Sequence, residues 1–380
     1  MKIQQTQYSE GHWQTLRTSP EFDGTACQLV LAFGAKKLLL QSELLAHIRH
    51  QYPQAQLVIG STAGEIIADS ACDDSLTATA IYLQKSRVAC ALGNIRDAAN
   101  SFEAGCALMK KLDPDGLVNV LVIADGTLVN GSELVEGLNQ CKPASARIVG
   151  GLAGDGEAFE STLVGLNDAV GEGMIAAVGF YGAHLRAGSG SLGGWDEFGP
   201  ERTITRSQKN VLFEIDGKNA LSLYKNYLGA YAQELPGSAF LFPLAISPPD
   251  GNEKLVRTIL TINEEDQSMT FAGNMPEGSK LRLMKANFDR LIDASSVAAK
   301  DCYEGLMDST PELAILISCV GRKIILKGRI YEEIEAARDI FGSGPFFTGF
   351  YSYGEISPLN TSTVCELHNQ TMTITTLSEI

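Results

Sequence analysis

The residues with the clearest chemical potential form a row near the end of the chain. In the stretch TGFYSYGEISP, the residues Tyr351, Tyr353 and Glu355 alternate with others. Because successive side chains of an extended chain point to opposite faces, the two phenols and the carboxylate would share one face. The glycines of this stretch indicate turns or the close approach of another group. Such a face suits the binding of a small ligand better than a dry core.

Arg322 adds a positive charge to the same candidate site. It follows the apolar run LAILISC, a predicted strand, at the point where a loop would face a ligand. Arg322 could hold a ligand carboxylate, with Glu355 or Tyr351 holding the ligand amine through charge-assisted hydrogen bonds. Alternatively, Arg322 pairs with Glu332 or Glu333 of the next predicted helix. The sequence leaves both roles open.

Cys319 ends the same apolar run and could serve as the nucleophile of an enzyme. The sequence places no histidine of the same segment where it would activate this thiol. The eight cysteines are scattered, without a C-x-x-C pair, and several lie in apolar runs. We therefore expect reduced, buried thiols rather than disulfides or zinc ligands.

The five histidines matter because a metal or haem function would use one of them. His368 follows the stretch TGFYSYGEISP and is next to Asn369, so both are candidate ligand-binding residues. His184 lies in an apolar predicted strand, where a hydrogen-bonded core histidine is the usual role. His47 and His50 are three residues apart on one predicted helix face and could bind a metal, but their polar neighbours favour a solvated face.

The elements that must position these residues repeat three times. Each copy combines a strand, a helix, a second strand and a glycine turn. The interval from a strand end to the first glycine after the next strand is 27, 25 and 30 residues, counted from Phe33 to Gly60, Asp125 to Gly150 and Cys319 to Gly349. This near-constant period predicts repeated βαβ units with parallel strands. Ligands of such sheets bind beyond the carboxyl ends of the strands, so we expect a pocket where the turns converge.

An acidic residue recurs in or beside each glycine turn. The three residues are Glu65, Asp155 and Glu355. They could bind a ligand amine or accept backbone N–H groups within their turns. The sequence does not decide between these roles.

Composition and context exclude several function classes. The formal net charge of -15 opposes binding to nucleic acid and to anionic membranes. No apolar run is long enough to cross a bilayer, and the first residues lack the apolar core of a signal peptide, so we expect a cytoplasmic protein. The G-x-G-x-x-G match GSGSLG is followed by GGWDEFGP, which cannot open a helix, so a dinucleotide loop is not expected.

Several motifs in the same order resemble the FIST sensory proteins over nearly the whole chain. They are IGSTAGEI, GGLAGDG, TRSQKNVLFEIDGKNALSLYKNYLG, NMPEGSKLRLMKAN, ISCVGRK, GFYSYGEISP and LHNQTMTITTL. The resemblance implies an amino-terminal leader (1–26), a FIST N domain (27–216) and a FIST C domain (217–380). We therefore expect an α/β fold of repeated βαβ units with mixed sheets.

The resemblance also implies a non-enzymatic, cytoplasmic bacterial sensor of a small molecule such as an amino acid. A narrower implication is haem-dependent nitric oxide sensing that regulates a partner histidine kinase or cyclic-di-GMP enzyme. A haem sensor needs an axial ligand and an apolar pocket, with His368 as the first candidate and His184 as the second. The small-ligand alternative uses Cys319, Arg322, Tyr351, Tyr353, Glu355, His368 and Asn369. A cysteine-dependent enzyme is a third possibility.

Overall fold

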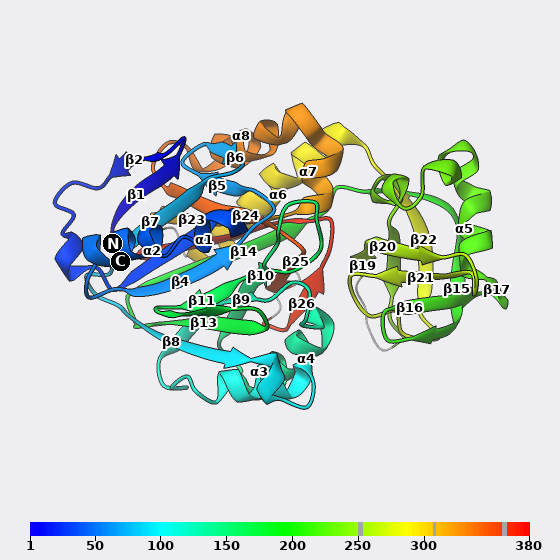
Figure 1. Cartoon of the computed structure of the whole chain (residues 1–380), viewed down its shortest axis with the longest axis horizontal. Coiled ribbons are helices and arrows are strands. Elements are labelled where there is room, and N and C mark those ends of the chain that lie inside the picture. The colour runs from blue at the N-terminus through cyan, green and yellow to red at the C-terminus, as the bar shows by residue number, and fades with distance from the viewer. Residues whose placement is uncertain (250–253, 307–308, 359–362) are drawn as a thin grey trace.

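The computed structural model describes residues 1–249, 254–306, 309–358 and 363–380, which form a large body and a smaller lobe (Figure 1). The lobe is built from residues 196–285, and the body contains the segments on either side of it. The two chain ends lie side by side on the body, away from the lobe.

Within the described residues, the body contains three mixed sheets, each built around one repeat. The first runs in the order β12 (Ala169–Gly171), β11 (Val164–Leu166), β4 (Gln56–Ser61), β3 (Leu29–Gly34), β7 (Leu76–Tyr82), β1 (Lys2–Ser9) and β2 (His12–Thr18). The second runs β26 (Cys365–His368), β25 (Gly354–Pro358), β10 (Arg147–Leu152), β9 (Leu117–Ala124), β13 (Met174–Tyr181) and β8 (Arg87–Asn94). The third runs β14 (Leu185–Leu192), β27 (Met372–Glu379), β23 (Leu313–Cys319), β24 (Phe346–Ser352), β5 (Glu65–Ile67) and β6 (Ser70–Cys72).

The structure confirms the repeated strand, helix and strand units. The strand pairs β3 and β4, β9 and β10, and β23 and β24 are all parallel, as a helical crossover requires. The crossovers contain α1 (Lys36–Leu39) and α2 (Ser42–Gln51), then α4 (Gly131–Cys141), then α7 (Val320–Leu326) and α8 (Ile330–Phe341). Strands β3 and β23 are buried along their whole length, which explains their continuous apolar sequences.

The three sheets are interlocked in a ring. After its second strand, each repeat crosses into a neighbouring sheet. Strand β5 of the first repeat pairs with β24, β25 of the third repeat pairs with β10, and β11, which follows the second repeat, pairs with β4. Each repeat therefore completes the sheet of another, and the body has an approximate threefold arrangement.

Two further helices cover the outside of the body. Helix α3 (Ser101–Met109) packs on α4, and α6 (Phe288–Leu306) packs on β14 and β27. Gly188 and Gly190 of β14 let α6 approach closely, because a Cβ atom at either position would meet backbone carbonyls of that helix. The GSGSLG match, rejected above as a dinucleotide loop, therefore lies largely within a partly buried strand on which α6 packs.

The expectation that all cysteines are reduced is wrong for one pair. Cys106 of α3 and Cys141 of α4 form a disulfide with their Cα atoms 5.2 Å apart. Gly105 and Gly137 allow this approach, because a side chain at either position would meet the backbone of the other helix. The remaining cysteines are free.

The lobe is a separate antiparallel sheet with its own core. Its order is β19 (Leu255–Arg257), β18 (Leu244–Ser247), β22 (Lys280–Lys285), β15 (Asp196–Gln208), β16 (Val211–Ile215), β21 (Ser268–Phe271) and β20 (Ile259–Asn263), with β17 (Lys218–Asn219) paired to β16. Helix α5 (Ala220–Leu228) packs on it through Leu221 and Tyr224. Residues 1–26, expected as a leader, form β1 and β2 at the edge of the first sheet.

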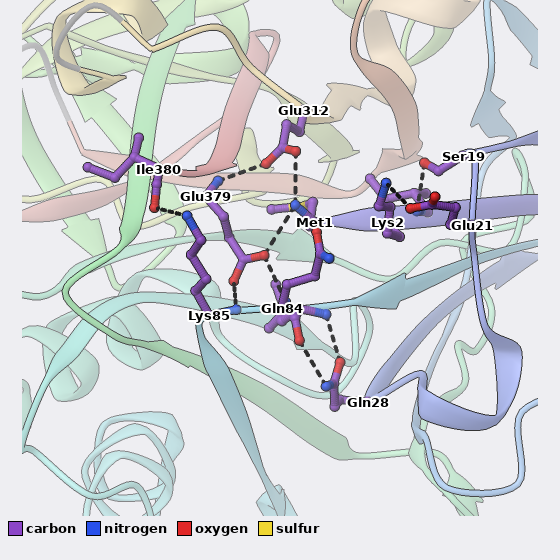
Figure 2. A network of polar contacts seen from close by, with 12 residues as sticks. Met1, Lys2, Ser19, Glu21, Gln28, Gln84, Lys85, Glu312, Glu379 and Ile380 are labelled. Carbon is purple, nitrogen blue, oxygen red and sulfur yellow. Dashed lines mark hydrogen bonds and ion pairs between the residues drawn. The ribbon is translucent and has the colours of Figure 1, made fainter.

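Polar contacts hold the two chain ends against the body (Figure 2). The amino group of Met1 lies 2.9 Å from a carboxylate oxygen of Glu312 and 3.1 Å from one of Glu379. Glu379 also accepts hydrogen bonds of 2.9 Å from the backbone N–H groups of Gln84 and Lys85. These contacts join the third sheet to the turn between β7 and β8.

Gly349→Ala tests the tight packing of the third glycine turn. Gly349 has φ +154°, and a Cβ atom there would meet the carbonyl oxygen of Leu316, which belongs to a paired strand and cannot move away. We expect the substitution to lower the free energy of unfolding by roughly 3 kcal/mol or more, measured by urea denaturation.

The matched control is Gly60→Ala at the equivalent position of the first repeat. The nearest atom to a Cβ there is a side-chain methyl of Ile123 at 3.1 Å, which can shift. Equal losses for the two variants would contradict this account of the turn.

Candidate functional site

The three glycine turns meet at the centre of the body. Each turn donates a backbone hydrogen bond to one of the others, so the three form a closed set. The bonds run from Ala63 N to Tyr351 O at 2.9 Å, from Tyr353 N to Leu152 O at 3.1 Å and from Gly154 N to Ser61 O at 2.9 Å. The turns therefore converge, as the sequence predicted.

A cavity of about 390 Å³, called here the main cleft, lies between the body and the lobe. The body side contains Gly126, Thr127, Leu128, Val129, Asn130, Gly131, Leu152, Phe159, Cys319, Val320 and Tyr353. The lobe side contains Asn210, Phe240, Thr258, Leu260, Phe271, Ala272 and Gly273. This volume is in the range of cavities that hold small organic ligands.

The position of the main cleft agrees with the sequence prediction. Strands β10 and β23 end at Leu152 and Cys319, which line the cavity, and β9 ends just before the lining segment 126–131. These are the carboxyl ends of parallel strands, where ligands of such sheets bind. The second and third repeats supply the body side of the cleft.

The lining of the main cleft contains no charged side chain and no histidine among the described residues. Asn130 and Asn210 have their amides engaged, since their Nδ2 groups donate to Asn274 Oδ1 at 3.1 Å and to Phe271 O at 2.8 Å. Thr258 differs, because its side chain is buried and its hydroxyl has no hydrogen-bond partner within the described ranges. Its hydroxyl is therefore a polar group without a protein partner.

Aromatic rings form one wall of the cleft. The ring of Tyr353 stacks on that of Phe159 with centroids 4.5 Å apart, and Phe159 lies 6.5 Å from Phe240 of the lobe. The Tyr353 hydroxyl contacts the carboxylate of Asp155 and accepts backbone N–H groups of Asp155 and Phe159 at 3.2 Å. Asp155, expected as one of the recurring acids, thus holds the loop that brings Phe159 to the cleft.

The equivalent space of the first repeat has a different character. A cavity of about 380 Å³, called here the charged cleft, is lined by Lys36, Lys37, Asp73, Asp74, Asp155 and Glu160 together with the first glycine turn. In the third repeat, Lys323 occupies the corresponding position. Its Nζ donates to Ala63 O at 2.7 Å and contacts Asp73, against Gly64 of the first turn.

The predicted row of Tyr351, Tyr353 and Glu355 does not form one ligand-facing surface. The chain leaves the third sheet at Ser352 and enters the second at Gly354, so the alternation is interrupted. Of the three side chains, Tyr353 lines the main cleft. Tyr351 is buried and donates to Glu333, and Glu355 is buried within its turn, as described below.

Arg322 takes the second of its two predicted roles. Its guanidinium is fully buried and pairs with Glu333 at 2.9 Å. It also donates to the carbonyl oxygens of Gly193 at 2.7 Å and Leu291 at 2.6 Å. Glu333 in turn accepts from the Tyr351 hydroxyl at 2.9 Å. Since its hydrogen-bonding groups are engaged inside the protein, Arg322 is not placed to hold a ligand carboxylate.

Glu65 and Glu355 occupy equivalent positions and make equivalent bonds. Glu65 accepts the Thr62 hydroxyl at 2.6 Å and both the N–H and the hydroxyl of Ser75. Glu355 accepts the Ser352 hydroxyl at 2.6 Å and both the N–H and the hydroxyl of Thr371. Burial raises the pKa of each carboxyl to about 7.

The strand register shows that the second repeat lacks this carboxyl. The residue after Glu65 pairs with Gly349, and the residue after Glu355 pairs with Gly150. In the same way, the residue after Leu163 pairs with Gly60. Leu163 therefore stands where the other two repeats have glutamate. The two glutamates stabilise their own turns by accepting backbone N–H groups. This is the second of the two predicted roles, and not the binding of a ligand amine.

The candidate metal and nucleophile residues are placed as follows. His368 is buried, with Nε2 3.1 Å from the carbonyl oxygen of Ser357, and burial lowers its pKa to about 4. His184 was expected in an apolar strand, but it is exposed in the turn between β13 and β14. Cys319 lines the main cleft, and burial raises the pKa of its thiol, which disfavours the reactive thiolate. Asn369 is buried, and its amide has no partner among the described residues.

These residues do not fit haem. A haem iron needs an axial ligand that faces the cavity. His368 does not line the main cleft and has its Nε2 engaged with a carbonyl, and His184 lies in an exposed turn. The described lining residues also include no cation for the two haem carboxylates.

Within the described ranges, no group of three or more His, Cys, Asp or Glu side chains is arranged to hold a metal ion. His47 stacks on Trp13 with centroids 4.8 Å apart. No helix in the described part of the chain combines the length and apolar character needed to span a membrane.

Sequence reasoning missed the lobe side of the cleft. Phe240 and Thr258 belong to no repeat and to none of the motifs quoted above, and Asn210 lies in one of those motifs but carries no signal of a ligand contact. Because the repeat period covers only the body, it could not indicate which lobe residues face the carboxyl ends of the strands.

The buried glutamates predict a pH dependence of stability. Between pH 4.5 and 7 the unfolded chain loses the proton of Glu355 while the folded chain keeps it, so the contribution of Glu355 to the free energy of unfolding falls as the pH rises. The fall amounts to roughly 3 kcal/mol for each such group. Buried His368, whose pKa is lowered to about 4, contributes a rise between pH 4 and 6.5, so the glutamate contribution is obtained by comparing variants. Glu355→Gln should remove about half of the fall that Glu65 and Glu355 produce together, measured by chemical denaturation from pH 4 to 8.

Two variants control this experiment. Glu65→Gln should flatten the profile by a similar amount, because its surroundings match, and Glu304→Gln on the surface should leave it unchanged. A Glu355→Gln profile parallel to that of the unmodified protein would show that Glu355 ionises normally in the fold.

Comparison with known proteins identifies the family. The FIST N domain model matches residues 28–218, and the FIST C domain model matches residues 220–358. No curated protein matches. A solved structure described as cyanuric acid hydrolase from A. caulinodans has a TM-score of 0.37 and 7% identity, covering 94% of this chain and 91% of that one. The chain belongs to the FIST family, with a FIST N domain followed by a FIST C domain.

Proposed function

We propose that this protein is a sensor whose small-molecule ligand binds in the main cleft and changes how the lobe is held against the body. FIST domains are sensory domains that bind small ligands. The observation that carries the proposal is that both parts line one cavity, at the carboxyl ends of the parallel strands. A ligand there would contact both parts at once.

Polar contacts beside the cleft join the lobe to the body. Asn274 bonds Asn130 and, through its backbone N–H, the Ser132 hydroxyl, both at 3.1 Å. Arg257 donates to the carbonyl oxygen of Leu367 at 2.8 Å, which joins β19 to β26. A ligand that binds the present arrangement better than an opened one would shift the balance between them.

The signalling output is proposed to be the position of the lobe, read by a partner chain in the cytoplasm. The FIST resemblance suggests a histidine kinase or a cyclic-di-GMP enzyme as that partner. We propose binding without catalysis, because the Cys319 thiol in the cleft is buried and its raised pKa keeps it protonated.

We favour a small organic ligand over haem-dependent nitric oxide sensing. Two observations support this choice: the cleft has no histidine among its described lining residues, and the Nε2 of the buried His368 is engaged. A haem function would require a rearrangement that frees His368 from Ser357.

Ala272→Trp tests the proposal by filling the main cleft. Ala272 lines the cavity and follows β21, so an indole there would occupy the ligand volume. Compounds from a metabolite set that raise the melting temperature of the unmodified protein by several degrees should fail to do so in this variant. Val297→Trp, on the exposed side of α6, is the control and should respond normally.

Two outcomes would contradict the proposal. One is that all stabilising compounds act equally on Ala272→Trp. The other is a sharp Soret band on addition of haem that shifts with nitric oxide, persists in Ala272→Trp and is lost in His368→Ala.

A further inference from the structure

The charge of the main cleft limits the ligand that it can hold. Its described lining contains no lysine, arginine, histidine, aspartate or glutamate. Removing an ionised group from water into such a site costs several kcal/mol, on the order of the penalty for a buried unpaired ion. The guanidinium of Arg257 lies behind Gly273, and it donates to carbonyl oxygens of the protein. The described lining therefore favours a ligand with no net or local charge in the part that the cleft encloses.

The absence of charge is a property of this cleft and not of the fold. The charged cleft occupies the equivalent place in the first repeat, yet it presents Lys36, Lys37 and several carboxylates. In the third repeat, the same place is taken by Lys323. The same backbone arrangement thus accepts charged side chains twice, whereas the described lining of the main cleft has none.

Exposed apolar side chains also mark the main cleft. Leu128 is 46% exposed, and Phe159 and Leu260 are both 37% exposed, although each borders this cavity. The rings of Phe159, Tyr353 and Phe240 form one apolar wall, in which Phe159 stacks on Tyr353. An apolar wall of this kind favours a ligand ring that packs against its exposed part and covers it from water.

One polar requirement remains inside this apolar site. The Thr258 side chain is 3% exposed, and its hydroxyl has no partner among the described residues. A buried hydroxyl without a partner is unfavourable. The Thr258 oxygen has almost no accessible surface, so a ligand group that accepts or donates a hydrogen bond reaches it only when the Thr258 side chain turns toward the cleft. The ligand is thus expected to carry a polar group that reaches Thr258.

We propose that the ligand of the main cleft is an uncharged aromatic or heteroaromatic molecule whose hydrogen-bonding group contacts Thr258 and whose ring lies against Phe159 and Tyr353. This inference rests on the proposed function and narrows its ligand class. It differs from the amino-acid ligand that the family resemblance suggests, because a free amino acid carries both an ammonium and a carboxylate group.

A panel of matched ring compounds tests the inference. Each pair has an uncharged and an ionised member at pH 7.5, such as nicotinamide and nicotinate or indole and indole-3-carboxylate, with L-phenylalanine and L-tryptophan as zwitterions. Binding is measured by saturation-transfer NMR and titration. We expect the uncharged members to bind at least about tenfold more tightly than their ionised partners, which corresponds to about 1.4 kcal/mol.

Variants of the two clefts locate the binding and its polar contact. Thr258→Val keeps the side-chain shape, removes the unpartnered hydroxyl and should leave the fold intact. It should weaken binding of the polar uncharged members several-fold and leave indole, whose binding depends more on its ring, less affected. Lys36→Ala in the charged cleft is the control and should change neither the affinity of the polar uncharged members nor that of indole.

The outcomes separate the two proposals. If ionised or zwitterionic members bind more tightly and Ala272→Trp abolishes that binding, the cleft is the ligand site but the ligand class is wrong. If Ala272→Trp abolishes the binding of no compound from the metabolite set or from the ring panel, the cleft is not the ligand site. The proposed function is then overturned together with the inference. Unchanged affinity of every uncharged member in Thr258→Val would overturn the assigned polar contact.

Discussion

The closed set of backbone hydrogen bonds between the three glycine turns is the constraint on which the rest of the structure depends. Each turn must come close enough to bond the next, and a residue with a side chain at Gly150 or Gly349 would meet the backbone of the neighbouring strand. Because each repeat then continues into the sheet of another, the three sheets cannot separate independently. This ring fixes where the carboxyl ends of the parallel strands point, and so where clefts can form.

The equivalent positions at the carboxyl ends of the parallel strands differ in character among the three repeats. One position is lined by charged side chains and one is occupied by Lys323. The third has no charged side chain in its described lining and is covered by the lobe. Charged and hydrogen-bonded residues of the body, such as Arg322 with Glu333, serve mainly to hold elements together. The site proposed for ligand binding is therefore marked by the absence of charge, by exposed rings and by the unpartnered hydroxyl of Thr258.

Local sequence signals predicted the part of this arrangement that depends on local physics. Continuous apolar runs identified β3 and β23, and the spacing of Gly60, Gly150 and Gly349 identified the repeats and the edge where a pocket forms. Long-range pairing was not predictable in this way. Nothing adjacent to Arg322 indicates that Gly193 and Leu291 will bind its guanidinium, and nothing near Tyr353 indicates that the chain changes sheets there. The lobe residues of the cleft and the disulfide between Cys106 and Cys141 likewise depend on contacts between distant segments.

Native mass spectrometry of the protein after incubation with a small-molecule extract of cells tests the central claim most directly. The account predicts one bound species of low mass on the unmodified chain, uncharged and ring-bearing when released and identified, and no such species on Ala272→Trp. A bound species with the mass of haem, or one retained equally by both proteins, would contradict the assignment of the main cleft as the sensory site.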